Sequence, residues 1–164
     1  MLRQLWTNFA SQHYVQRLTG RVQRLTGWLR LRLPSRNSSG SLGADGERLA
    51  ARYLQRQGYR ILARGHRQRL GELDLIALDG STLVFVEVKT WRRGDSGDPS
   101  EAVDSRKQDR LTRAALVYLK RRRLLEHPAR FDVISIVWPE REAQPKIRHF
   151  INAFEAVGRW QMYR

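Results

Sequence analysis

Cysteine is absent from this chain of 164 residues, which excludes disulfides, thiolate catalysis and cysteine-ligated zinc. The four histidines, His13, His66, His127 and His149, are scattered without the spacing of a zinc site. No apolar run approaches the length of a membrane span, and no export signal with an apolar central region is present. We therefore expect a cytoplasmic protein in which any metal ion is bound by oxygen ligands.

Acidic residues are scarce relative to basic ones. There are 16 Asp and Glu against 31 Lys and Arg, which gives a formal net charge of +15 and a pI near 11.4. Such a balance favours polyanionic partners, with nucleic acid first and an anionic membrane second. All but four of the basic residues are arginine, whose guanidinium binds phosphate bidentately and stacks on bases. A G+C-rich genome would produce the same preference, and composition does not separate the two explanations.

Residues 1–42 contain seven arginines and no acid, unlike the rest of the chain. The sequence of residues 15–20 recurs unchanged at 22–27, and this heptad offset places apolar residues on one face of a helix. A basic amphipathic arm that orders on nucleic acid, a membrane or a partner, a transit peptide and a leader all remain open. Ser and Gly in residues 34–41 predict a linker. We expect an arm over residues 1–42 and a folded domain over 43–164.

The remaining patterns predict an α/β domain with a mixed central sheet flanked by helices. We expect helices at residues 46–58 and 99–123, because apolar residues recur there at helical spacing. Short apolar runs predict strands at residues 59–63, 71–78, 82–90, 130–138 and 146–151. Residues 91–98 are expected to form a polar loop.

Two acids interrupt the apolar runs of neighbouring strands. Asp74 lies in the first run and Glu87 in the second, and an Asp79-Gly80 turn separates the two strands. Glu87 and Lys89 point the same way because strand side chains alternate, and an antiparallel hairpin brings Asp74 near the level of Glu87. Two carboxylates and an ammonium would outline a divalent-metal site. The alternative is an ordinary ion pair on the solvated side of an edge strand.

An ordered set of motifs along the domain resembles the YraN family, from about residue 43 to residue 154. The motifs are Glu47, Gly58-Tyr59, Gly71-Glu72-Leu73-Asp74-Leu75-Ile76, Phe85-Val86-Glu87-Val88-Lys89, Lys107-Gln108 and Arg130-Phe131-Asp132-Val133. That bacterial family is counted among the restriction-endonuclease-like nucleases and is similar to archaeal Holliday junction resolvases.

The resemblance implies a restriction-endonuclease-like core in which Asp74 and Glu87 ligate Mg²⁺ or Mn²⁺. Glu47 would complete or adjoin the metal site, and Lys89 would orient or help deprotonate the attacking water. The implied reaction is hydrolysis of phosphodiester bonds in structured or branched DNA during repair or recombination. Hard oxygen ligands suit this chemistry, because a hard cation polarises the phosphoryl oxygen and lowers the pKa of bound water.

Residues beside these motifs are candidates for DNA contacts. Trp91 could stack on a base, with Arg92 and Arg93 on the backbone, although Trp91 could equally be a packing residue. Lys107 and Gln108 are further candidates, and for Gln108 the alternative is solvated helix surface.

Two other acids have alternative roles. Glu72 could support the site or pair with an arginine, and Asp132 is expected to pair with one.

Two rival functions are a non-catalytic nucleic-acid-binding protein that keeps the nuclease fold and a membrane-surface scaffold. Binding alone needs no acids near phosphate, which favours the nuclease. We expect no membrane partner, and a homodimer is possible.

Overall fold

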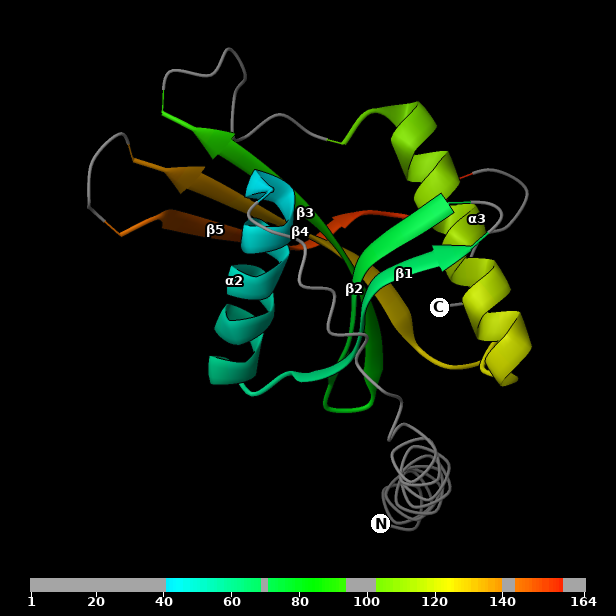
Figure 1. The fold of residues 1–164 in the computed structure, drawn as a ribbon. Coiled ribbons are helices and arrows are strands. Elements are labelled where there is room, and N and C mark those ends of the chain that lie inside the picture. The colour runs from blue at the N-terminus through cyan, green and yellow to red at the C-terminus, as the bar shows by residue number, and fades with distance from the viewer. Residues whose placement is uncertain (1–40, 69–70, 94–102, 140–143, 158–164) are drawn as a thin grey trace, which may run out of the picture. The chain divides into compact units, whose positions relative to one another are not determined.

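The computed structural model describes residues 41–68, 71–93, 103–139 and 144–157, and the expectations for the N-terminal arm lie outside these ranges. The elements follow one another in the predicted order (Figure 1). They are α2 (Leu42–Arg56), β1 (Arg60–Gln68), β2 (Gly71–Asp79), β3 (Thr82–Arg92), α3 (Ser105–Arg122), β4 (Ala129–Trp138) and β5 (Lys146–Phe154).

The strands form one five-stranded sheet in the order β1-β2-β3-β4-β5. All neighbours are antiparallel except β3 and β4, which are parallel. Parallel neighbours need a crossover connection, and the segment that contains α3 supplies it. The mixed sheet with two helices confirms the predicted α/β class and is consistent with a restriction-endonuclease-like core.

Helix α2 covers one face of the sheet. Its buried side chains pack on alternate residues of the three central strands, as expected from the period of two along a strand. This core cluster consists of Ala50, Ala51, Leu54, Leu75, Ala77, Val84, Val86, Ile134 and Ile136.

Helix α3 lies on the other face. The ring of Tyr118 packs edge-on against Phe85 of β3 and against His66 of β1. Phe85 in turn contacts Phe131 of β4, so aromatic side chains fill much of this second core. Figure 1 shows α2 and α3 on either side of the strands.

Several element boundaries differ from the predicted ones because capping residues decide them. Helix α2 begins at Leu42 rather than residue 46, since the Ser41 hydroxyl accepts the Ala44 N–H and caps the helix. Helix α3 begins at Ser105, where the Asp104 carboxylate accepts the Lys107 N–H. Residues 99–102, where the helix was expected to start, lie outside the described ranges.

Strand β3 is longer than predicted. It continues through Trp91 to Arg92, residues that we expected in a loop, because β4 pairs with it in parallel as far as Arg92 and Trp138. Residues 94–98 of that loop are not among those described. No helix in the described part of the chain is long and apolar enough to cross a membrane.

Candidate active site

Strands β2 and β3 form a fork. They pair from the Asp79-Gly80 turn as far as Leu75 and Val86, and there the ladder between them ends. Beyond that point β2 stays paired with β1, while β3 stays paired with β4. Figure 1 shows β2 and β3 running together from their common turn and then separating, β2 towards α3 and β3 away from it. Asp74 and Glu87 are the first residues beyond the last pair.

Asp74 and Glu87 come together where the fork opens. The Val88 N–H donates to Asp74 Oδ2 at 2.8 Å, so the Asp74 side chain occupies the place where the strand ladder stops. Burial raises the pKa of Asp74 to about 7, and repulsion from the Glu87 carboxylate adds to this. The two carboxylates therefore lie close enough to repel each other, and their proximity is what the sequence predicted.

Glu87 is buried, with 7% of its surface exposed, and one oxygen lacks a hydrogen-bond partner. Lys107 Nζ lies 2.9 Å from Glu87 Oε1 and forms an ion pair with it. The other oxygen, Oε2, has no hydrogen-bond partner among the described residues. An unsatisfied buried carboxylate oxygen is costly, and such a group is typical of a site that binds something further.

Glu47 extends towards the fork from α2, and Glu72 raises its pKa more than Glu87 does. A Cβ built on Gly65 would lie 3.7 Å from Glu72 Oε1 and 3.8 Å from Glu47 Oε2, so both carboxylates approach the same point on β1. Partial burial is the main cause that raises the pKa of Glu47. Repulsion from Glu72 and, more weakly, from Glu87 raises it further. Glu47 also contributes to the raised pKa of Asp74. It therefore adjoins the pair.

Of the two roles considered for Glu72, the pairing with an arginine is observed. Arg67 Nε lies 2.9 Å from Glu72 Oε1, and the two residues face each other across the β1–β2 ladder. This ion pair fixes Glu72 beside Glu47, which explains why Glu72 raises the pKa of Glu47.

Lys89 lies two residues beyond Glu87 and therefore on the same face of β3. Its ammonium is 6.0 Å from the centroid of the Trp91 ring. The pKa of Asp104, at the start of α3, is lowered mainly by the Lys107 N–H and also by the charge of Lys89. Lys89 therefore lies between the aromatic end of β3 and the N-terminus of α3.

The predicted DNA-contacting residues fall into two groups. Trp91, Arg92 and Arg93 continue the β3 side of the fork, where Trp91 is half-buried and both arginines are exposed. Lys107 is already engaged by Glu87. The Gln108 amide donates to the Val103 carbonyl at 2.7 Å. This side chain therefore holds the residues just before α3 against the start of the helix.

The acid pair fits a divalent cation in its chemistry. A cation would bind the unpartnered Glu87 oxygen and relieve the repulsion that raises the pKa of Asp74. Within the described ranges, no three or more Asp, Glu, His or Cys residues are grouped to hold a metal ion. Mg²⁺ commonly needs only one or two carboxylates, because water and substrate phosphate supply its other ligands. Asp74 and Glu87 are therefore the two residues that would hold it.

Sequence reasoning missed two members of this site. Val88 contributes its backbone N–H, which every residue except proline has, so its residue type does not indicate this role. Lys107 was considered only as a DNA contact, whereas its ion pair joins α3 to the middle of the sheet. Nothing in the local pattern around Lys107 gives the docking angle of α3.

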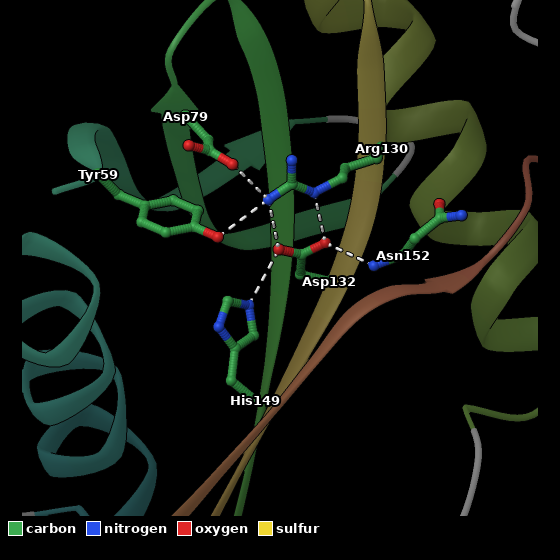
Figure 2. Close-up of polar contacts among 6 residues, drawn as sticks. All are labelled: Tyr59, Asp79, Arg130, Asp132, His149 and Asn152. Atoms are coloured by element: carbon green, nitrogen blue, oxygen red, sulfur yellow. Dashed lines mark hydrogen bonds and ion pairs between the residues drawn. The ribbon is translucent and has the colours of Figure 1, made fainter. Parts of the chain in front are cut away.

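A second polar cluster lies on β4 and is distinct from the acid pair. Asp132, which is fully buried, accepts Arg130 Nε at 3.0 Å and the Asn152 N–H at 2.9 Å, and it lies 2.9 Å from His149 Nε2. Arg130 also donates to the Tyr59 hydroxyl (Figure 2). The predicted pairing of Asp132 with an arginine is confirmed. Asp132 is paired with Val86 in register, so it faces α2 rather than α3.

Comparison with known proteins identifies the family. The sequence model described as "Uncharacterised protein family UPF0102" matches residues 46–136, more than half of the chain. This chain belongs to the UPF0102 family. The match confirms the resemblance to the YraN group, which is the same family.

Curated UPF0102 proteins match most of the chain. The UPF0102 protein of Rhodopirellula baltica is 44% identical over 140 residues, which are 83% of this chain and 84% of the relative. That of Geobacter metallireducens is 51% identical over 115 residues, 70% of this chain and 93% of the relative. That of Geobacter sulfurreducens is 52% identical over 114 residues, 70% and 88% of the two chains. The UPF0102 match contains Glu47, Asp74, Glu87 and Lys107.

Proposed function

We propose that this UPF0102 protein is a metal-dependent endonuclease that hydrolyses phosphodiester bonds in structured or branched DNA, in cytoplasmic repair or recombination. One observation carries the proposal. The Asp74 and Glu87 carboxylates are held together inside the sheet, where they repel each other and leave a buried oxygen without a partner. A protein gains no stability from such a pair, so its value lies in what the pair binds.

Asp74 and Glu87 would hold Mg²⁺ or Mn²⁺, with Glu47 beside them. When bound, the cation would polarise the phosphoryl oxygen and lower the pKa of a water molecule. The protein groups have separate tasks. The Val88 N–H orients Asp74, and Lys89, on the same face as Glu87, would orient the attacking water or help to deprotonate it.

DNA as the substrate is supported by charge. The formal net charge is +15, and two exposed arginines, Arg92 at the end of β3 and Arg93 directly after it, lie five and six residues beyond Glu87. Trp91 offers a ring for base stacking next to these arginines. A backbone contact by arginine and a stacked base need no particular sequence, which suits recognition of DNA structure.

A non-catalytic nucleic-acid-binding protein is the second candidate. The observation that favours it is the Lys107 ammonium on Glu87, which already neutralises one of the two acids. A protein of this kind would bind DNA equally well with and without a divalent cation, and it would cleave none.

A cleavage assay separates the two candidates. Full-length protein is incubated with duplex, flap and four-way DNA, with Mg²⁺, with Mn²⁺ and with a chelator. Asp74→Asn and Glu87→Gln test the acid pair. Asp109→Asn is the matched control, because among the described residues the Asp109 side chain forms a local pair with Arg113 one turn further along α3.

The nuclease predicts cleavage by wild type and Asp109→Asn that requires the metal and is lost in both site variants. DNA affinity without metal should hold or rise in the site variants, because each removes a negative charge near phosphate. Cleavage by Asp74→Asn and Glu87→Gln at the wild-type rate would show that the assignment of these residues is wrong. Metal-independent binding without cleavage of any substrate would leave the binding protein as the function.

A further inference from the structure

Lys107 is a lysine in an electrostatically unfavourable place. It lies in the first turn of α3, where the helix dipole is positive and the described turn contains no acid. Its neighbours Arg106 and Arg110 are also basic. The helix disfavours a cation there, and two carboxylates compensate for it. Asp104 at the N-cap accepts the Lys107 N–H, and Glu87 Oε1 lies 2.9 Å from the ammonium.

The backbone of Lys107 is fixed, while its side chain has room to leave. The Lys107 N–H donates to the Asp104 carboxylate, and the next residue, Gln108, donates to Val103 through its side chain. The Lys107 side chain is 34% exposed, whereas that of Glu87 is only 8% exposed. The ammonium can therefore move towards solvent from an anchored helix turn, but the carboxylate has no comparable freedom.

We infer that Lys107 is an exchangeable counter-cation, which occupies the Glu87 carboxylate until a divalent ion binds there and then turns to the substrate phosphate. The inference rests on the proposed metal-dependent nuclease and adds a positioning residue to it. Lys107 contacts one Glu87 oxygen and leaves the other without a partner, so the carboxylate is only half satisfied. A divalent cation and an ammonium repel each other, and the two would compete for the same carboxylate.

The substrate phosphate is the new partner that we infer for the released ammonium. The ammonium remains tethered to the first turn of α3 beside Glu87, from where it would be available to a phosphate of the substrate. Lysine binds phosphate as a mobile point charge, and the positive end of the helix strengthens attraction for an anion. The exchange would therefore couple metal loading to substrate binding.

A simple structural ion pair makes the opposite prediction for metal binding. If Lys107 only held Glu87 in place, its removal would disorder the carboxylate and weaken the affinity for a divalent ion. If the two cations compete, its removal strengthens that affinity. The sign of the change is therefore the decisive quantity.

The experiment measures Mn²⁺ affinity by the electron paramagnetic resonance signal of free Mn²⁺, using full-length protein without DNA. The variants are Lys107→Met, Lys107→Arg and, as the matched control, Lys120→Met, an exposed lysine further along α3. We expect Lys107→Met to bind Mn²⁺ about fivefold more tightly, since a partly exposed ion pair is worth up to about that factor. Lys107→Arg and Lys120→Met should bind as wild type does.

Single-turnover cleavage at saturating Mn²⁺ provides the second readout. We expect Lys107→Met to cleave about tenfold more slowly despite its tighter metal binding, because a charge that faces the phosphate is gone. Unchanged or weaker Mn²⁺ affinity in Lys107→Met, with normal binding by wild type, would overturn the exchange alone. A wild-type protein that binds Mn²⁺ no better than Asp74→Asn would overturn the proposed function, and the exchange with it.

A third measurement follows Lys107 in the wild-type protein, so its result does not depend on whether Lys107→Met folds. The ¹⁵N resonance of the Lys107 ammonium, assigned by its loss in Lys107→Arg, should shift when Mg²⁺ is added. In Glu87→Gln the same addition should leave it unmoved. A resonance that stays constant in a wild-type protein saturated with Mg²⁺ would exclude the exchange.

Discussion

At the scale of single residues, Asp74 has a strongly raised pKa. Burial and the nearby Glu87 carboxylate raise its pKa to about 7, while the Val88 N–H pulls in the other direction. The metal-free protein therefore holds a proton on Asp74 up to nearly neutral pH. Metal binding must release this proton, so affinity for the cation should rise with pH.

The first prediction concerns pH and stability. The folded protein keeps a proton on Asp74 up to pH 7, whereas an unfolded chain releases it near the ordinary value of 3.8. The folded state binds more protons across this window, so its free energy of unfolding falls as pH rises from about 4 to 7. Asp74→Asn should be more stable than wild type at pH 8 by about 1–2 kcal/mol. Urea unfolding at pH 5 and pH 8 measures both effects.

Mg²⁺ provides the control for this prediction. Added Mg²⁺ should raise the unfolding midpoint of wild type at pH 8 and leave that of Asp74→Asn unchanged, because only wild type has the charged pair. A wild-type midpoint that does not respond to pH between 5 and 8 would contradict the raised pKa.

The second prediction concerns Asp132 and Asp79, which both pair with Arg130. Asp132 has no exposed side-chain surface, whereas Asp79 is 44% exposed. Asp132→Ala leaves Arg130 and His149 without their buried partner and should lower the free energy of unfolding by about 3–5 kcal/mol. Asp79→Ala should cost less than about 1 kcal/mol, because water screens this pair. Urea unfolding of both variants at pH 7 compares them directly.

Mn²⁺ affinity separates the Asp132 cluster from the site. The cluster faces α2, while Lys107 and Tyr118 place Glu87 and Phe85 on the face of α3. Folded Asp132→Ala should therefore bind Mn²⁺ as wild type does. Loss of Mn²⁺ binding in the folded variant would show that the two clusters are coupled.

At the scale of elements, the contact between α2 and β3 decides where Glu47 lies. Gly46 packs so closely on β3 that a Cβ at this position would collide with the Thr90 side chain. Glu47 is the next residue of the helix. A side chain at position 46 would therefore displace the helix turn that carries Glu47.

The third prediction compares two glycines of α2. Gly46→Ala should destabilise the protein by about 1–3 kcal/mol through overpacking against Thr90. Gly43→Ala is the control, because nothing lies within 4 Å of a Cβ there. It should be neutral or stabilising by up to about 1 kcal/mol, since alanine favours a helix. Thermal unfolding measures both, and Thr90→Ala in the Gly46→Ala background should restore part of the loss.

At the scale of the whole molecule, charge is divided between the arm and the folded domain. Residues 1–40 contain seven arginines and no acid, which leaves +8 of the net +15 for the rest of the chain. Ser41 must stay in any truncation, because its hydroxyl caps α2. A deletion that ends at residue 42, the boundary expected from sequence, would remove this cap.

The fourth prediction concerns deletion of residues 1–40. The truncated protein should bind DNA more weakly and with a shallower dependence on salt, because fewer counterions are released. Single-turnover cleavage at saturating DNA should persist, since Asp74, Glu87 and Lys107 remain. Fluorescence anisotropy at several salt concentrations gives the slopes. Identical slopes for the two proteins would show that the arm does not contribute to DNA binding. Association with liposomes that is lost on deletion would show that the arm binds a membrane.

Sequence by itself determined the order of elements and the pairing of the two acids. Strand alternation and the Asp79-Gly80 turn are local properties, and together they fix the faces and the approximate register of Asp74 and Glu87. The family resemblance was likewise a property of ordered motifs, and the match to UPF0102 confirms it. Element ends were less certain, because a single cap such as Ser41 or Asp104 decides them.

Only the tertiary structure decided what surrounds that pair. The fork exists because β4 pairs with β3 and β1 with β2, and neither pairing can be deduced from the hairpin alone. The ion pair of Lys107 with Glu87 joins residues on α3 and β3 whose distance depends on how the helix docks. Local patterns specify a residue's neighbours along its own element, whereas burial and partner charges come from packing between elements. The raised pKa of Asp74 depends on both of these, so no motif could have predicted it.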